Sequence, residues 1–219
     1  MDHSGSTSSE HRHGEAVSTD VAADLTAAGY MENGQSGTWD FVGAASTAPN
    51  IAGPEFAAAA NATVASRGWS NLATAEADGF SQPTKYTDPL HWWNEDYVND
   101  GITGDPTKPE SLVFDPRNGK FLATMWLMPI GEHGPAVTGI DAADGRWHVH
   151  PGSLCYREDK MIPWDQMSKD GTCPDGMTAA PWSAEMLHVW VAGDKPFTSK
   201  MPDEAAEALE EINKRPSNK

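Results

Sequence analysis

The residues best suited to chemistry are two histidines in a short β-prone segment, Arg146-Trp147-His148-Val149-His150. Alternate residues of a strand point to the same face, so His148 and His150 are expected side by side, with Trp147 and Val149 turned into apolar packing. Two neutral imidazoles at this spacing can bind Zn, Cu, Ni, Fe or Mn. The alternative is a pair of partly exposed histidines that are hydrogen-bonded to nearby backbone.

A third histidine, His188, lies in a second apolar β-prone segment, 186–192. Such a position favours a histidine only when a ligand or a hydrogen bond satisfies the ring, and the alternative here is a buried ring that donates to a backbone carbonyl. If the two segments are neighbouring strands, three imidazoles converge on one divalent ion, copper or zinc. His91, among aromatic residues, is a fourth candidate ligand that could equally serve in packing; it or a carboxylate would complete the metal site of His148, His150 and His188.

Other polar side chains could contribute to this site or to different ones. Glu185 and Glu132 could supply an oxygen ligand, or act as a general base on a metal-activated water. His133 lies in a glycine-flanked loop and is expected to be exposed to solvent.

The N-terminal segment offers an alternative metal site. A free amine followed by histidine at the third position can bind Cu(II) or Ni(II) in a square plane, and this segment carries His3, His11 and His13. Residues 1–17 have almost no apolar side chains and are expected to form a disordered tether. Such a tether is typical of the mature part of an exported protein whose leader was removed; the alternative is a cytosolic protein with two free thiols.

The two cysteines, Cys155 and Cys173, lie on either side of the polar segment 157–172. A disulfide between them would hold that segment against the strand with the histidines and stabilise the fold by roughly 3 kcal/mol in the chain-entropy model. The alternative is that Cys155 is itself a ligand in a His/Cys copper site, with a methionine nearby. We predict the disulfide.

The elements that must position these residues predict an α+β fold with an antiparallel sheet at its core. One domain, 18–219, is expected to follow the tether, with a helical part over 18–79, a mainly β part over 80–197 and a C-terminal helix over 202–215. The clearest helix spans 56–78 and is expected to be interrupted near Gly68.

Within the β part, a hairpin is predicted between 112–114 and 121–128, because Asn118-Gly119 is typical of its turn. Further strands are expected over 146–156 and 186–192. Three polar or Pro-rich segments are expected to be irregular, namely 38–53, 80–110 and 157–185.

Composition excludes some classes of partner. The 219 residues contain 32 Asp and Glu against 15 Lys and Arg, a net charge of −17, which disfavours nucleic acid and anionic membrane surfaces. No run of apolar residues is long enough to span a bilayer, so no membrane-spanning segment is expected. The 9 tryptophans and 6 phenylalanines are enough for a packed core.

The order of several motifs resembles a group of uncharacterised secreted proteins from high-GC Gram-positive bacteria. The shared motifs run from Asn94-Glu95-Asp96-Tyr97 through Trp147-His148-Val149-His150 and Gly171-Thr172-Cys173-Pro174 to Met186-Leu187-His188-Val189-Trp190. The resemblance covers roughly residues 85 to 197 and implies export and a disulfide. This chain differs from those proteins at 194–197, where they tend to have Cys-Gly-Pro-Phe and it has Asp-Lys-Pro-Phe.

Three functional hypotheses follow. The first is an extracytoplasmic metal-binding protein, secreted or anchored to the cell envelope, that captures or handles copper or zinc. The second is a metal-dependent hydrolase or oxidoreductase that uses the same histidines with an open coordination position. The third is a cell-envelope interaction protein whose histidines are structural.

Overall fold

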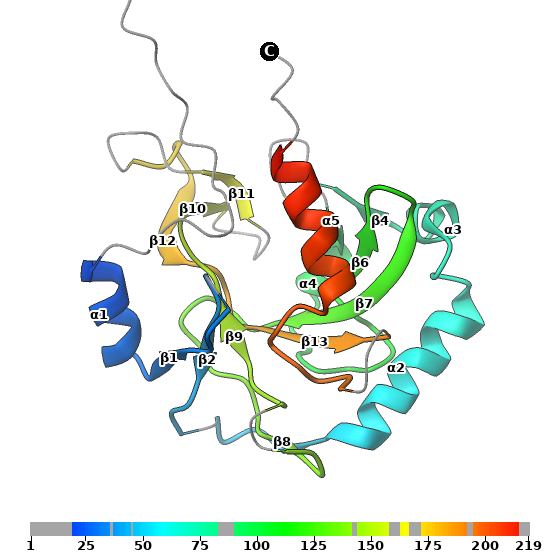
Figure 1. Ribbon diagram of the computed structural model, residues 1–219, viewed down its shortest axis with the longest axis horizontal. Coiled ribbons are helices and arrows are strands. Elements are labelled where there is room, and N and C mark those ends of the chain that lie inside the picture. Colours follow the sequence, from blue (N-terminus) through cyan, green and yellow to red (C-terminus); the bar gives the residue numbers. More distant parts are fainter. Residues whose placement is uncertain are drawn as a thin grey trace, which may run out of the picture.

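An eight-stranded antiparallel sheet forms the centre of the computed structural model, which describes residues 19–35, 37–44, 46–82, 90–141, 144–157, 163–166, 172–191 and 195–214. In spatial order its strands are β1 (Tyr30–Glu32), β2 (Trp39–Phe41), β9 (His148–Val149), β13 (Met186–Trp190), β7 (Lys120–Leu127), β6 (Ser111–Asp115), β5 (His91–Asn94) and β4 (Phe80–Ser81) (Figure 1). The predicted α+β class is confirmed, and strands dominate it. The predicted tether over 1–17 and the alternative metal site at His3, His11 and His13 lie outside the described residues.

Two smaller sheets adjoin the large one. In the first, β10 (Pro151–Arg157) lies between β11 (Pro163–Gln166) and β12 (Met177–Trp182); in the second, β3 (Ile51–Ala52) pairs in parallel with β8 (Val137–Thr138). The single strand predicted over 146–156 is therefore divided at His150, because β9 pairs with strands of the large sheet and β10 with strands of another.

The helices are α1 (Thr19–Ala27), α2 (Gly53–Arg67), α3 (Leu72–Ala77), α4 (Glu95–Val98) and α5 (Asp203–Lys214). The predicted interruption at Gly68 is confirmed: this residue ends α2 in the left-handed conformation, with φ of 70°. The side chain of Asn71 then accepts a hydrogen bond from the backbone N–H of Thr74 and caps α3. Within the described ranges, each helix is too short or too polar to cross a membrane.

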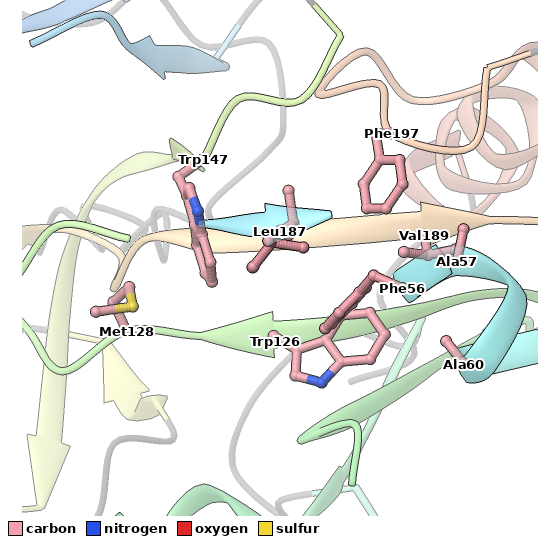
Figure 2. Close-up of a cluster of buried hydrophobic side chains, with 10 residues drawn as sticks. Phe56, Ala57, Ala60, Trp126, Met128, Trp147, Leu187, Val189 and Phe197 are labelled. Atoms are coloured by element: carbon pink, nitrogen blue, oxygen red, sulfur yellow. The ribbon is translucent and has the colours of Figure 1, made fainter. Parts of the chain in front are cut away.

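Helices α2 and α5 cover opposite faces of the middle of the sheet. On one face, Phe56 of α2 packs on Trp126 and Val189, in the cluster that Figure 2 shows. On the other face, alanines of α5 pack around Trp190, the residue that follows Val189 in β13. Successive residues of a strand point to opposite faces, so α2 and α5 enclose the sheet between two apolar layers.

Three expectations of irregular structure are partly wrong. The segment 80–110 contains β4, β5 and α4, and 157–185 contains β11 and β12. The segment 38–53 contains β2 and β3, so the part expected to be helical, 18–79, also carries short strands. These strands have only two to six residues and are fixed by pairing with distant partners. They are therefore too short for an alternation of apolar and polar residues to predict them from the local sequence. The hairpin over Asn118-Gly119 and the C-terminal helix form as predicted.

The predicted disulfide is confirmed. Cys155 of β10 is bonded to Cys173 with a Cα–Cα distance of 5.6 Å. The alternative in which Cys155 binds copper is wrong, because its sulfur is already bonded.

Candidate functional site

Four histidines lie close together beside the centre of the large sheet. His91, His148 and His188 are in β5, β9 and β13, and His150 directly follows β9. The ring centroids of His148 and His188 are 5.1 Å apart, and those of His148 and His150 are 5.4 Å apart. The Nε2 atoms of His91 and His188 are separated by 3.4 Å. The structure therefore brings together all four histidines that the sequence singled out, and we call them the histidine cluster.

Strand register explains how residues so distant in sequence meet. His148 of β9 is paired with Met186 of β13, which puts His188 one step further along the same face. His91 lies across β6 and β7 from His188, and the same-face positions between them include Ser111 and Ala123. Val113 and Met125 occupy the other same-face positions between these two histidines.

The two central histidines are almost wholly buried. His148 is 2% and His188 5% exposed. Burial lowers the pKa of His148 to about 4, although an interaction with the backbone of Arg146 opposes this shift. Burial together with the neighbouring His148, His91 and His150 lowers the pKa of His188 well below its ordinary value. Both rings are therefore neutral at physiological pH, which is the form of imidazole that binds metals.

Hydrogen bonding within the histidine cluster is incomplete. Among the described residues, Nδ1 of His148 and Nδ1 of His188 have no hydrogen-bond partner, although both atoms are buried. An unsatisfied buried polar atom is destabilising by about 1–3 kcal/mol, so such atoms are rare in folded proteins. By contrast, Nδ1–H of His150 donates to the carbonyl of Gly37 at 2.8 Å, which makes Nε2 the unprotonated nitrogen of the neutral His150 ring.

The side chains of the histidine cluster do not share one focal point as they stand. In the described part of the chain, no three His, Cys, Asp or Glu side chains are arranged to hold a metal ion. The rings of His148 and His188 are stacked at an interplanar angle of 23° and so face each other. Rotation of these side chains would be needed before their nitrogens could meet at one ion.

Sequence reasoning missed three neighbours of the histidine cluster. Asp40 of β2 is buried and lies directly across the strand pair from His148, where burial raises its pKa. The indoles of Trp93 and Trp190 stack on His91 and His188. The alternation of apolar and polar residues in Trp39-Asp40-Phe41 could have indicated a strand. It could not have indicated which strand this short segment pairs with.

The two glutamates proposed as ligand or base have other surroundings. Glu185 precedes Met186 in the chain, so it faces away from the histidine cluster; its carboxylate accepts hydrogen bonds from Tyr30 Oη, His133 Nδ1 and the backbone N–H of Gly134. Glu132 is exposed. His133 is more ordered than expected, because its ring also stacks on Phe41 with centroids 3.9 Å apart.

The resemblance to secreted Gram-positive proteins, drawn from the order of the motifs, stays a prediction. No protein-family model, curated protein or solved structure matches this chain.

Proposed function

We propose that the protein binds one copper or zinc ion at His91, His148, His150 and His188 and serves in the capture or handling of that metal. The observation that carries the proposal is the pair of buried ring nitrogens, on His148 and His188, that lack a partner among the described residues. A bound ion would take up the lone pairs of neutral imidazoles and so offset the free energy lost by burying them.

The spacing of the rings supports the proposal. Nε2 of His91 lies 3.4 Å from Nε2 of His188, within hydrogen-bond distance. When Nε2–H of His188 donates to His91, Nδ1 is the unprotonated nitrogen of the neutral His188 ring and is the atom that would bind the ion. Imidazoles are suitable ligands for both Cu(II) and Zn(II), so the donor set fits either metal. Rotation of His148 about its side-chain bonds is the adjustment that the stacked rings require.

The support from His150 is of another kind. Histidine ligands in metal sites usually donate the second ring N–H to a carbonyl or carboxylate, which fixes the orientation of the ring. His150 makes this bond to the carbonyl of Gly37. Its ring is thereby held with Nε2 as the nitrogen that would bind the ion.

The histidine cluster favours binding over the two other hypotheses. Structural histidines are hydrogen-bonded, whereas those at the centre of this cluster leave nitrogens unsatisfied within the described residues. An enzyme would need a base near the ion. Glu185, the buried carboxylate named for that role, is engaged on the other side of β13, and Asp40, which lies beside His148, accepts a hydrogen bond from Asn33. We therefore propose metal binding and assign no reaction.

We place this function outside the cytoplasm, secreted or at the cell envelope. The disulfide Cys155–Cys173 supports that location, because such bonds persist mainly in oxidising compartments. The net charge of −17 is consistent with attraction of metal cations from solution.

The test is a metal-loading experiment with tag-free protein. The chain is incubated with CuSO4 or ZnCl2, dialysed exhaustively and analysed for metal by mass spectrometry. About one ion per chain should remain, and His148→Ala, His188→Ala and the more exposed His91→Ala should each reduce the retained metal. Circular dichroism identifies any variant that fails to fold.

A matched control removes three histidines elsewhere. The triple variant His3→Ala, His11→Ala, His13→Ala should retain the metal. Loss of metal in the triple variant, or full retention in both His148→Ala and His188→Ala, would reject the histidine cluster as the site.

A further inference from the structure

A cleft of about 890 Å³ opens on the side of the sheet away from the histidine cluster. It lies between the segment before α2, the loop around Gly104 and the loop that carries His133. Its apolar lining includes Ile51 and Phe56, and its polar lining includes His133. The volume is within the range of small-molecule sites in proteins.

Contacts outside the cleft fix the tautomer of the His133 ring. Oε1 of Glu185 lies 2.8 Å from Tyr30 Oη and 2.8 Å from His133 Nδ1, while Oε2 accepts the backbone N–H of Gly134 at 2.9 Å. A carboxylate can only accept hydrogen bonds, so Nδ1 of His133 carries the proton. In the neutral ring Nε2 is then a hydrogen-bond acceptor on the opposite edge.

The orientation of His133 is held from two directions. Its side chain is 37% exposed, yet its ring is stacked on Phe41 at an interplanar angle of 13° and bonded to the nearly buried carboxylate of Glu185. An acceptor nitrogen is therefore presented by a ring with little freedom to rotate. Such an oriented polar group within an apolar lining is what confers specificity on a ligand pocket.

Charge selects the class of ligand. Glu55 and Glu132 both line the cleft, and the described residues lining it include neither Lys nor Arg. Neither glutamate forms an ion pair with another described residue. These carboxylates favour a cation and repel an anion, and the Nε2 acceptor of His133 favours a ligand with an N–H donor.

We propose that this cleft binds a small organic ammonium ion with an apolar body. The ammonium group donates to Nε2 of His133 and is attracted by Glu55 and Glu132, while the apolar body lies against Ile51, Phe56 and Met128. Tyr30 and Glu185 act as positioning residues, because they hold His133 without lining the cleft. The site is distinct from the histidine cluster, since Glu185 and Met186 point to opposite faces of the sheet.

The test compares three probes of nearly equal size and different charge. Phenethylamine, 2-phenylethanol and 3-phenylpropionate are titrated at pH 8 into metal-free protein, and binding is followed by NMR and calorimetry. Phenethylamine should bind at least tenfold more tightly than 3-phenylpropionate, with 2-phenylethanol in between.

Two variants assign the contacts. His133→Phe keeps a ring beside Phe41 but removes Nε2, and should weaken phenethylamine binding about fivefold while leaving 2-phenylethanol less affected. The double variant Glu55→Gln, Glu132→Gln should weaken it about three- to tenfold. The double variant Glu76→Gln, Glu207→Gln removes equal charge at exposed positions on α3 and α5 and should bind phenethylamine like the unaltered protein.

Failure of all three probes to give saturable binding would overturn the proposal. Equal affinity for the amine and the carboxylate would also overturn it, as would a preference for the amine that neither variant reduces.

Discussion

Two polar groups of residues lie on opposite faces of the sheet, one around Glu185 just before β13 and one around His188 within it, and they differ in how completely their polar atoms are hydrogen-bonded. Around Glu185, both carboxylate oxygens accept hydrogen bonds from Tyr30, His133 and Gly134. Three residues later, on the other face, His188 and its neighbour His148 each leave Nδ1 without a partner in the described structure. One network is complete within the protein, and the other is not.

The difference shows where the binding of a ligand would stabilise the protein most. A satisfied network stabilises the fold and holds its members in place, whereas unsatisfied buried atoms reduce the free energy of unfolding until something binds them. We therefore assign His133 a positional role maintained by Glu185, and the histidine cluster a binding role. The following predictions, from the largest expected effect to the smallest, test this distinction.

The largest effect is expected from Glu185→Ala. The change leaves the buried Tyr30 hydroxyl and the Gly134 N–H without their acceptor, and each such group is destabilising by about 1–3 kcal/mol. The free energy of unfolding should fall by about 3–5 kcal/mol in denaturant titrations. A loss below 1 kcal/mol would mean that the network contributes little to the fold.

Acid should destabilise the metal-free protein through the histidine cluster. Unfolded His148 takes up a proton near its ordinary pKa of 6.5, whereas burial lowers the folded pKa to about 4, so the unfolded state holds more protons between these values. Stability should fall by about 3 kcal/mol as the pH decreases from 6.5 to 4. His188 adds to this trend in the same direction.

Denaturant titrations across this pH range check the prediction. The variant His148→Leu should lose less stability in acid than the unaltered protein, because its side chain takes up no proton. Parallel pH dependences in the two proteins would contradict the assignment to His148.

Metal binding should restore the stability that the unsatisfied nitrogens of the histidine cluster cost the protein. With free metal at about 100 times its dissociation constant, the free energy of unfolding should rise by about 2.7 kcal/mol, provided that the unfolded chain does not bind it. Thermal unfolding at several Zn(II) concentrations measures the rise. His188→Ala should abolish most of it, whereas the triple variant at His3, His11 and His13 should not.

The smallest effect is a gain in stability. In His188→Leu an apolar side chain replaces a buried ring with an unsatisfied nitrogen, so the metal-free protein should become about 1–2 kcal/mol more stable. His133→Leu should have the opposite sign, because it removes a bond to Glu185. Matching signs for the two variants would remove the contrast between the two faces.

Local patterns were sufficient to predict the hairpin and the proximity of the His148 and His150 side chains. Asn118-Gly119 predicted the turn, and Gly119 has the positive φ, 73°, that such a turn requires. The alternation of a strand predicted that His148 and His150 would lie close together, and their rings do. The cysteines predicted a disulfide because their positions flank one polar segment.

Contacts between residues that are far apart in the sequence could not be predicted in the same way. His91 reaches His188 only because β5, β6, β7 and β13 are neighbours in that order, and strand order depends on the energy of the whole sheet. Asp40 is in a three-residue strand. Glu185 was proposed as a ligand or base, and its actual partners Tyr30 and His133 could not be foreseen because they are far away in the sequence.

The stacking of Trp190 on His188 gives the protein an optical reporter of its own. The ring centroids lie 4.9 Å apart with planes inclined by 18°. A redox-active, paramagnetic Cu(II) ion bound by His188 would quench the emission of this indole, whereas Zn(II), with its filled d shell, would leave it bright. Since the chain has 9 tryptophans, copper should remove only part of the fluorescence, and that fraction would identify the metal in solution without any label.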